Sequence, residues 1–375
     1  MDPVNETRLG DYAFPQAAGP REFNASPLIL GSFGAEQAGE RSVFEALIFK
    51  RRQYSDEFRQ ALLEALPVVE MDINKRVAGQ AEAVRKTMGA FWEIASGLDL
   101  SAEKPAAAFL FYGPKGVGKS LLPQVLVDVL NHELSMRAGS KGLPEHERAF
   151  QLIEIDCARL PLPGAGLSSP ELAMNRSFLG LLQNPRAVVV FRNFDTESSV
   201  LKNSLSMIQE NGVLYGPGGV PLFFNQSVLI VELSSGKLPA VPVGFERAAE
   251  REYTDCAVKG LFQDAQREWF TQVRFEPLRR EAAEKAVYGM LQDCIMRAGK
   301  ANLTLNLEVE PELLSAVVDQ SLSETSGLEK LRRNVETMIL NPVLDYIRQA
   351  CSERETSSFQ LIVRPEGRVV PHPGY

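Results

Sequence analysis

Residues 113–120 read Gly113-Pro114-Lys115-Gly116-Val117-Gly118-Lys119-Ser120 and match the phosphate-loop pattern GxxxxGK[ST]. The apolar run Ala107–Tyr112 comes directly before this stretch, and Leu121–Leu134 follows it with the apolar spacing of a helix. The stretch therefore joins a strand to a helix, which is the context that the pattern requires. This context predicts a loop whose backbone N–H groups, together with the helix N-terminus, bind a phosphate group.

The loop predicts ATP or ADP as the cofactor, because its residue types serve different parts of a nucleotide. We expect Lys119 to reach the β- and γ-phosphates, and Ser120 to offer its hydroxyl to Mg²⁺. The glycines allow the backbone N–H groups to turn toward the phosphates. The predicted phosphate-binding residues are Gly113, Pro114, Lys115, Gly116, Val117, Gly118, Lys119, Ser120 and Leu121.

Strand-sized apolar runs alternate with helical stretches after the loop. The runs are Phe150–Ile155, Ala187–Phe191 and Ser227–Val231. This alternation predicts an α/β fold with a parallel sheet covered by helices on both faces. From about residue 277 helical patterns dominate, and they predict a small, mainly α C-terminal domain with a final strand. Its elements are Leu278–Ala298, Glu310–Ser321, Gly327–Gln349 and the strand Phe359–Val363.

The first 67 residues lie outside this alternation. Residues 1 to about 40 are rich in Gly, Pro, Ala and polar residues and predict an extended or poorly ordered arm. An amphipathic helix is expected over Ser42–Leu66, and Pro67 is expected to end it. We therefore divide the chain into an N-terminal extension (1–67), a nucleotide-binding core (68–276) and a C-terminal domain (277–375). The extension could dock a partner or clasp a neighbouring subunit.

Composition narrows the choice of partners and compartment. Lys and Arg total 40 against 48 Asp and Glu, a formal net charge of −8, which argues against a broad nucleic-acid surface. The four cysteines are far apart, so neither a zinc site nor a disulfide framework is indicated. The chain has no basic start followed by an apolar run, and no apolar stretch approaches the roughly 18–20 residues that span a bilayer. We therefore predict a cytoplasmic protein that does not bind a membrane.

The end of the third strand run decides whether ATP is hydrolysed. Hydrolysis needs an acid there to hold Mg²⁺ and a group that positions the attacking water, but the sequence has Arg192-Asn193. A cation cannot coordinate a metal, and an amide is a poor general base. If the register is shifted, Asp195 is the fallback metal acid. Arg192 is expected to pair with Glu232, which ends the neighbouring strand, or to reach toward the phosphates; the alternative is that both point to solvent.

Four stretches of the chain together follow the pattern of one known family. They are Ile73-Asn74-Lys75-Arg76-Val77-Ala78-Gly79-Gln80-Ala81-Glu82-Ala83-Val84, the phosphate loop, the ungapped stretch from Arg192 to Val231, and the lid signature of Gly327, Leu331-Arg332-Arg333 and Asn341-Pro342. By these motifs the chain resembles, from about residue 68 to residue 365, the Clp-type AAA+ unfoldases, specifically their second ATPase ring domain. The resemblance implies a P-loop AAA+ core with a C-terminal α-helical lid, normally assembled as a ring. It also implies that Val77 and Ala78 lie near the adenine.

The same resemblance shows which functional positions have changed. The metal-binding Asp of the family falls on Arg192, the catalytic Glu on Asn193, the polar sensor on Ser234 and the lid Arg on Glu329. The arginine finger falls on Glu268 and the pore-loop aromatic on Ala165, while Lys330 could replace the lid cation.

An intact phosphate loop beside altered turnover positions predicts a protein that binds ATP and hydrolyses it weakly or not at all. Such a protein would act as a nucleotide-stabilised scaffold or regulatory subunit, with a protein partner or neighbouring ring subunits. The alternatives are an active protein-remodelling ATPase, which needs an acid from elsewhere, and another P-loop enzyme such as a nucleotide kinase. The acidic charge and the lid signature argue against the last alternative.

Overall fold

The computed structural model describes ten segments of the chain, all within residues 46–375, the larger of two compact units. The segments are 54–98, 103–140, 149–160, 170–194, 199–216, 219–233, 268–300, 303–322, 327–353 and 358–371. The expected N-terminal arm and the first part of the helix expected from Ser42 lie outside them. So do the predicted positions Ala165, Asp195 and Ser234.

Five parallel strands form the central sheet, in the order β2-β3-β6-β1-β7. Four of them agree with the predicted runs to within a residue: β1 (Ala107–Tyr112), β2 (Gln151–Asp156), β3 (Ala187–Arg192) and β6 (Ser227–Glu232). The fifth, β7 (Thr271–Arg274), was not predicted. It is four residues long and only Val273 is buried, so it leaves no apolar run in the sequence.

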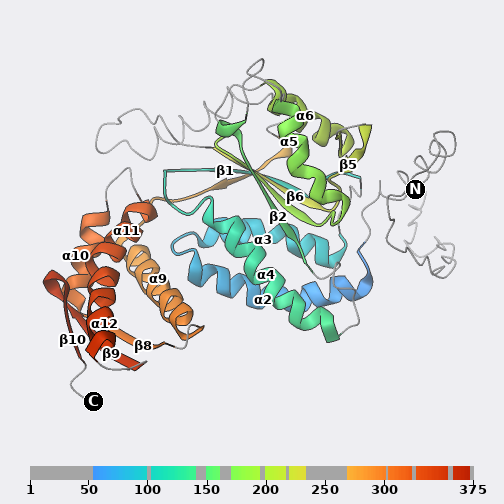
Figure 1. Cartoon of the computed structure of the whole chain (residues 1–375). Coiled ribbons are helices and arrows are strands. Elements are labelled where there is room, and N and C mark those ends of the chain that lie inside the picture. Colours follow the sequence, from blue (N-terminus) through green and yellow to red (C-terminus); the bar gives the residue numbers. More distant parts are fainter. Residues whose placement is uncertain are drawn as a thin grey trace, which may run out of the picture. The chain divides into compact units, whose positions relative to one another are not determined.

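Alternate residues of the central strands point to opposite faces of the sheet, and each set joins a different hydrophobic cluster. One face packs against helices α2 (Asp56–Arg76), α3 (Ala81–Ser96) and α4 (Leu121–Ser140), and the other packs against α5 (Pro170–Ser177) and α6 (Ser199–Asn211) (Figure 1). On the first face lie Phe109, Phe111, Val188, Val190, Val228 and Ile230. On the second lie Ala108, Leu110, Val189, Phe191, Leu229 and Val231. The predicted sheet with helices on both faces is therefore confirmed.

Helix α2 corrects the prediction that a helix ends at Pro67. The helix starts after Ser55, whose hydroxyl accepts a hydrogen bond from the Phe58 N–H at 3.2 Å, and it continues to Arg76 with Pro67 inside. A proline inside a helix costs about 3 kcal/mol. Packing of the apolar face of α2 against α3 and α4 offsets that cost, because Phe58 and Ile73, on either side of Pro67, are fully buried. The helix crosses the expected boundary at residue 67, and the division into domains stays a prediction.

The C-terminal part forms its own hydrophobic cluster from helices and a second sheet. The helices are α9 (Arg280–Lys300), α10 (Pro311–Ser321), α11 (Gly327–Val335) and α12 (Asn341–Glu353), and a π-helical turn, η5 (Glu336–Leu340), joins the last two. The sheet holds β8 (Thr304–Val309), β9 (Ser358–Arg364) and β10 (Arg368–Pro371) in the order β10-β9-β8. Only β9 was expected, because β8 alternates exposed with half-buried residues and so lacks an apolar run.

Shorter elements complete the described segments. They are the antiparallel hairpin of β4 (Val213–Tyr215) and β5 (Pro221–Phe223), and the 3-10 turns η2 (Cys157–Arg159), η3 (Phe178–Leu182) and η6 (Pro365–Gly367). Within the described ranges, no helix combines the length and the apolar character needed to cross a membrane.

Candidate nucleotide-binding site

The phosphate loop lies at the carboxyl end of β1. This strand is an inner strand of the sheet and pairs with β6 on one side and β7 on the other. From β1 the chain goes through α4 to β2 at one edge and later returns to β7 on the opposite side, so the strand order reverses beside β1. In open parallel sheets ligands bind at such a reversal, outside the carboxyl ends of the strands. The predicted loop is therefore in the place where this fold binds ligands.

Positive φ angles shape the loop. Gly113, Gly116 and Gly118 have φ of 136°, 71° and 106°, a region that only glycine enters without strain. At Gly113 a second constraint applies, because a β-carbon there would overlap the Phe275 carbonyl at the end of β7. These constraints explain why the loop needs glycine at the three positions, and a loop without side chains there lets backbone approach a ligand closely.

Lys119 is 5% exposed, and its amine turns back onto the loop. The Nζ atom donates hydrogen bonds to the carbonyl oxygens of Gly113 at 2.8 Å and Pro114 at 2.6 Å. These contacts satisfy a buried ammonium group that burial alone would destabilise. The same donors could bind a phosphate oxygen instead, which is the role that the sequence predicts for Lys119.

Ser120 contacts a carboxylate that the sequence analysis had not placed beside it. Its hydroxyl donates to the two carboxylate oxygens of Glu232, at 2.7 and 2.9 Å. Glu232 ends β6, the strand next to β1, and is 8% exposed. Burial raises the pKa of Glu232 above its usual value of 4.5, while the Ser120 hydrogen bond and the charges of Lys119 and Arg192 act in the opposite direction.

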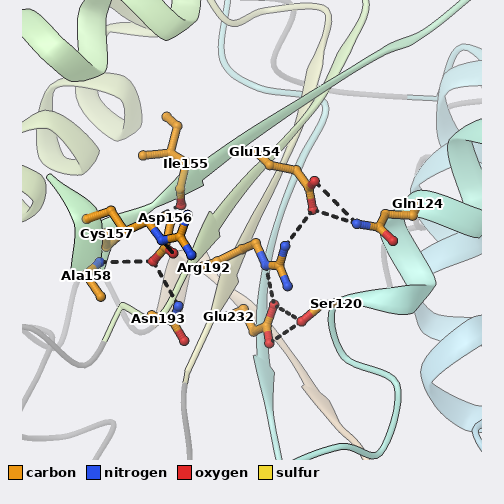
Figure 2. A network of polar contacts seen from close by, with 11 residues as sticks. Ser120, Gln124, Glu154, Ile155, Asp156, Cys157, Ala158, Arg192, Asn193 and Glu232 are labelled. Carbon is orange, nitrogen blue, oxygen red and sulfur yellow. Dashed lines mark hydrogen bonds and ion pairs between the residues drawn. The ribbon is translucent and has the colours of Figure 1, made fainter. Parts of the chain in front are cut away.

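Arg192 lies between two carboxylates (Figure 2). Its Nε is 3.9 Å from Glu232 Oε2, as the sequence analysis proposed, and its Nη1 is 3.4 Å from Glu154 Oε1. Gln124, in the first turn of α4, donates from Nε2 to both oxygens of Glu154, at 3.2 and 3.3 Å. Glu154 and Gln124 were not predicted from the sequence, although Glu154 lies near the end of β2, the strand beside β3. A connected chain of polar contacts thus runs from Ser120 to Gln124.

Asn193 occupies a strained position. Its φ is 55°, and among the described residues it is the only non-glycine with a positive φ. The side-chain amide donates from Nδ2 to Asp156 Oδ1 at 2.8 Å. Asp156 also accepts the Ala158 N–H at 3.2 Å (Figure 2). The same carboxylate pairs with Arg159 Nε at 3.1 Å. Asn193 therefore fixes the turn after β3, and its amide cannot act as a general base.

A Mg²⁺ ion beside Ser120 would lie close to the guanidinium of Arg192. The described residues hold no group of three or more His, Cys, Asp or Glu side chains that could bind a metal ion by themselves, so a Mg²⁺ would have to come with the nucleotide and use Glu232. An ion bound about 2.1 Å from Glu232 Oε2 would lie no more than about 6 Å from Arg192 Nε. At an effective dielectric of about 20 the two cations would repel each other by about 5 kcal/mol, before solvent screening lowers that figure. The predicted magnesium role of Ser120 is thus opposed by the guanidinium of Arg192.

The residues expected near the adenine are buried, and one of them, Val77, lies beside the loop. Val77 is 1% exposed and Ala78 is 5% exposed. A β-carbon on Gly118 would lie 3.5 Å from Val77 Cγ1 and 3.7 Å from Leu328 Cδ1, so α2 and α11 both reach this part of the loop. The Leu328 N–H donates to the Gly116 carbonyl at 2.6 Å. Contact with adenine itself stays a prediction.

The remaining predicted positions lie at the surface. Glu329 is exposed and follows the residue that contacts the loop, and Glu268, the arginine-finger position, is exposed too. Arg332 pairs with Glu336 one helical turn later, at 3.0 Å, which is typical of a solvated helix face.

No family model matches the chain, but individual proteins do. It is 24% identical over 302 residues to the ATP-dependent Clp protease ATP-binding subunit ClpL of Staphylococcus aureus, covering 76% of this chain and 40% of ClpL. It is 25% identical over 290 residues to the chaperone protein ClpB of Pseudomonas putida, covering 76% of this chain and 32% of ClpB. The structure matches the Saccharomyces cerevisiae Hsp104–ADP complex with a TM-score of 0.63 and 19% identity, over 82% of this chain and 53% of that one.

These similarities confirm the resemblance to Clp-type AAA+ proteins and the AAA+ fold. The chain spans less than half of the length of the two relatives it matches, ClpL and ClpB.

Proposed function

Starting from its homology to Clp-type AAA+ ATPases, we propose that this chain binds ATP or ADP at its phosphate loop and hydrolyses ATP slowly or not at all. The bound nucleotide then stabilises a scaffold or regulatory subunit of a protein assembly. The observation that carries this proposal is Arg192, a cation at the carboxyl end of β3 that is paired with Glu154 and Glu232.

The binding half of the proposal rests on the loop itself. Lys119 is buried with its amine against the loop, and three loop glycines keep positive φ angles. Nucleotide at about 100 times its dissociation constant adds about 2.7 kcal/mol to the free energy of unfolding. That gain gives the loop a use even when no phosphate is transferred.

The catalytic half rests on Arg192, the last residue of β3, and on Asn193, which follows it. Metal-assisted hydrolysis needs a carboxylate that can hold Mg²⁺ and a group that orients the attacking water. Arg192 opposes the metal by its charge, and the amide of Asn193 is already bonded to Asp156. Both requirements are therefore unmet at the positions that β3 supplies.

The partner that we propose is a protein, either a neighbouring subunit of a ring or a separate component of the assembly. The relatives are named as a chaperone and as a subunit of a protease, which are both proteins that act on other proteins. The part of the N-terminal extension that precedes α2 is our candidate docking segment, because it lies outside the region that resembles the AAA+ core and outside the helix that packs in that core.

Incubation of the purified full chain with excess ATP and Mg²⁺ tests this proposal, followed by identification of the retained nucleotide and of any released phosphate. We expect retained ATP and no phosphate above the level of a Lys119→Ala control. Steady phosphate release that the Lys119→Ala variant lacks would instead support an active protein-remodelling ATPase. Absence of any retained nucleotide would contradict the proposed function as a whole.

A further inference from the structure

Arg192 and Glu232 lie side by side at the carboxyl ends of two neighbouring strands and form an ion pair. Phe191 of β3 pairs in register with Val231 of β6, so the next residues along, Arg192 and Glu232, end adjacent strands side by side. The carboxylate that contacts Ser120 therefore comes from β6, while β3 contributes a cation to the same place. The Arg192–Glu232 pair therefore lies beside Ser120, the residue that follows Lys119 in the phosphate loop.

The guanidinium of Arg192 is positioned from several sides. Glu232 holds Nε from β6, and Glu154 holds Nη1 from β2. Gln124 of α4 fixes Glu154 in turn, through both of its carboxylate oxygens. Ion pairs with two strands, one of them supported by α4, restrict where this charge lies more than a single surface pair would.

The same guanidinium has capacity for a phosphate. It carries five N–H donors, and the contacts with the two acids use Nε and Nη1. Its planar arrangement of donors matches phosphate oxygens as well as carboxylates. About a third of the Arg192 side chain is exposed, at 36%, so part of it stays accessible to a ligand.

From this arrangement we infer that Arg192 takes the place of the divalent cation, so that the site binds the phosphate chain of a nucleoside triphosphate without Mg²⁺. The inference rests on the proposed nucleotide binding and adds to it the form in which the nucleotide is bound. Lys119 and Arg192 both supply positive charge to the surroundings of Ser120 and Glu232. Glu232, which would have to coordinate a metal, is paired with Arg192 and accepts the Ser120 hydrogen bond.

Calorimetric titration of the full-length protein with ATPγS, a slowly hydrolysed ATP analogue, tests the inference in two buffers. One buffer contains Mg²⁺ and the other contains EDTA. We expect the two dissociation constants to differ by less than about threefold. A tenfold change corresponds to 1.4 kcal/mol of binding free energy, so threefold corresponds to about half of that. A loss of tenfold or more in EDTA would overturn the inference and leave the proposed nucleotide binding intact. No binding in either buffer would instead contradict the proposed function, and the inference with it.

A substitution identifies the group responsible. Arg192→Gln removes the charge and keeps a polar side chain, so we expect affinity in EDTA to fall about tenfold or more and Mg²⁺ to restore part of it. Arg85→Gln is the matched control, because Arg85 pairs with Glu82 on the exposed surface of α3, and we expect it to bind like the natural protein. Unchanged affinity of Arg192→Gln in EDTA would overturn the inference. Should this variant not fold, the two-buffer comparison on the natural protein decides the matter alone.

Discussion

Asn193→Glu is the single change that would place an acid at the position where the related ATPases carry their catalytic glutamate. We expect it to fail as a gain of function and to destabilise the protein. The reason is local, because Asn193 combines a left-handed backbone with a hydrogen bond to Asp156. A glutamate fits neither condition, and Arg192 still opposes Mg²⁺ beside it.

The structure sets the size of the effect. Loss of the 2.8 Å hydrogen bond to the carboxylate of Asp156 costs about 1.5 kcal/mol. Holding a glutamate at φ 55° costs about 1 kcal/mol more than holding an asparagine there. Repulsion between the two carboxylates adds up to about 1 kcal/mol, because a third of Asp156, 33%, is exposed and solvent screens the charges. We therefore predict a loss of about 3 kcal/mol in the free energy of unfolding.

Urea unfolding, followed by the fluorescence of Trp92 and Trp269, measures this loss, and phosphate release measures turnover. Asn193→Gly is the control, because it loses the hydrogen bond but relaxes the backbone, so its predicted loss is only about 1 kcal/mol. If Asn193→Glu unfolds at the same urea concentration as the natural protein, the hydrogen bond to Asp156 and the backbone at residue 193 do not contribute the stability calculated above. Phosphate release by that variant with Arg192 in place would refute the account of the metal site.

Three further predictions concern the loop and its acid. Lys119→Ala should lower nucleotide affinity about 100-fold or more in calorimetry and abolish the rise in melting temperature that ATP causes, because the phosphates lose their main cation. Gly113→Ala should cost more than about 2 kcal/mol in urea unfolding, since φ is 136° and the new β-carbon would overlap the Phe275 carbonyl. Burial raises the pKa of Glu232, so the folded state holds this proton more tightly, and its contribution to stability should fall as pH rises from 4.5 through the raised value. Glu232→Gln should remove that fall in unfolding curves taken across pH, and a wild-type slope in the variant would show that another group causes it.

Much of the fold was predictable because the central strands are fully buried. Such strands appear in the sequence as apolar runs, and β1, β3 and β6 were located from them to within a residue. The strands β7 and β8 left no such signal, since most of their residues are exposed or half-buried. At Pro67 the local signal was present but wrong. Proline predicts the end of a helix, but packing of the rest of α2 outweighs the local cost of proline, and the helix continues to Arg76.

The site was predictable only in part. The phosphate loop is continuous in sequence, so its pattern locates it, and the Arg192–Glu232 pair followed from the expectation that their strands are neighbours. The Ser120–Glu232 hydrogen bond and the Glu154–Gln124 contact depend on where three separate segments come together in space. Residues so far apart in the chain show no spacing that a single sequence could reveal.

The hydrogen bond from Leu328 to the Gly116 carbonyl makes the first turn of α11 sensitive to the shape of the phosphate loop. A ligand that reorients this carbonyl weakens the bond and favours movement of α11, and a protein that displaces α11 acts on the loop in return. Thermodynamic linkage makes the two effects equal in size. A partner bound at α11 would therefore regulate nucleotide exchange, and nucleotide would regulate the partner, with no phosphate bond broken.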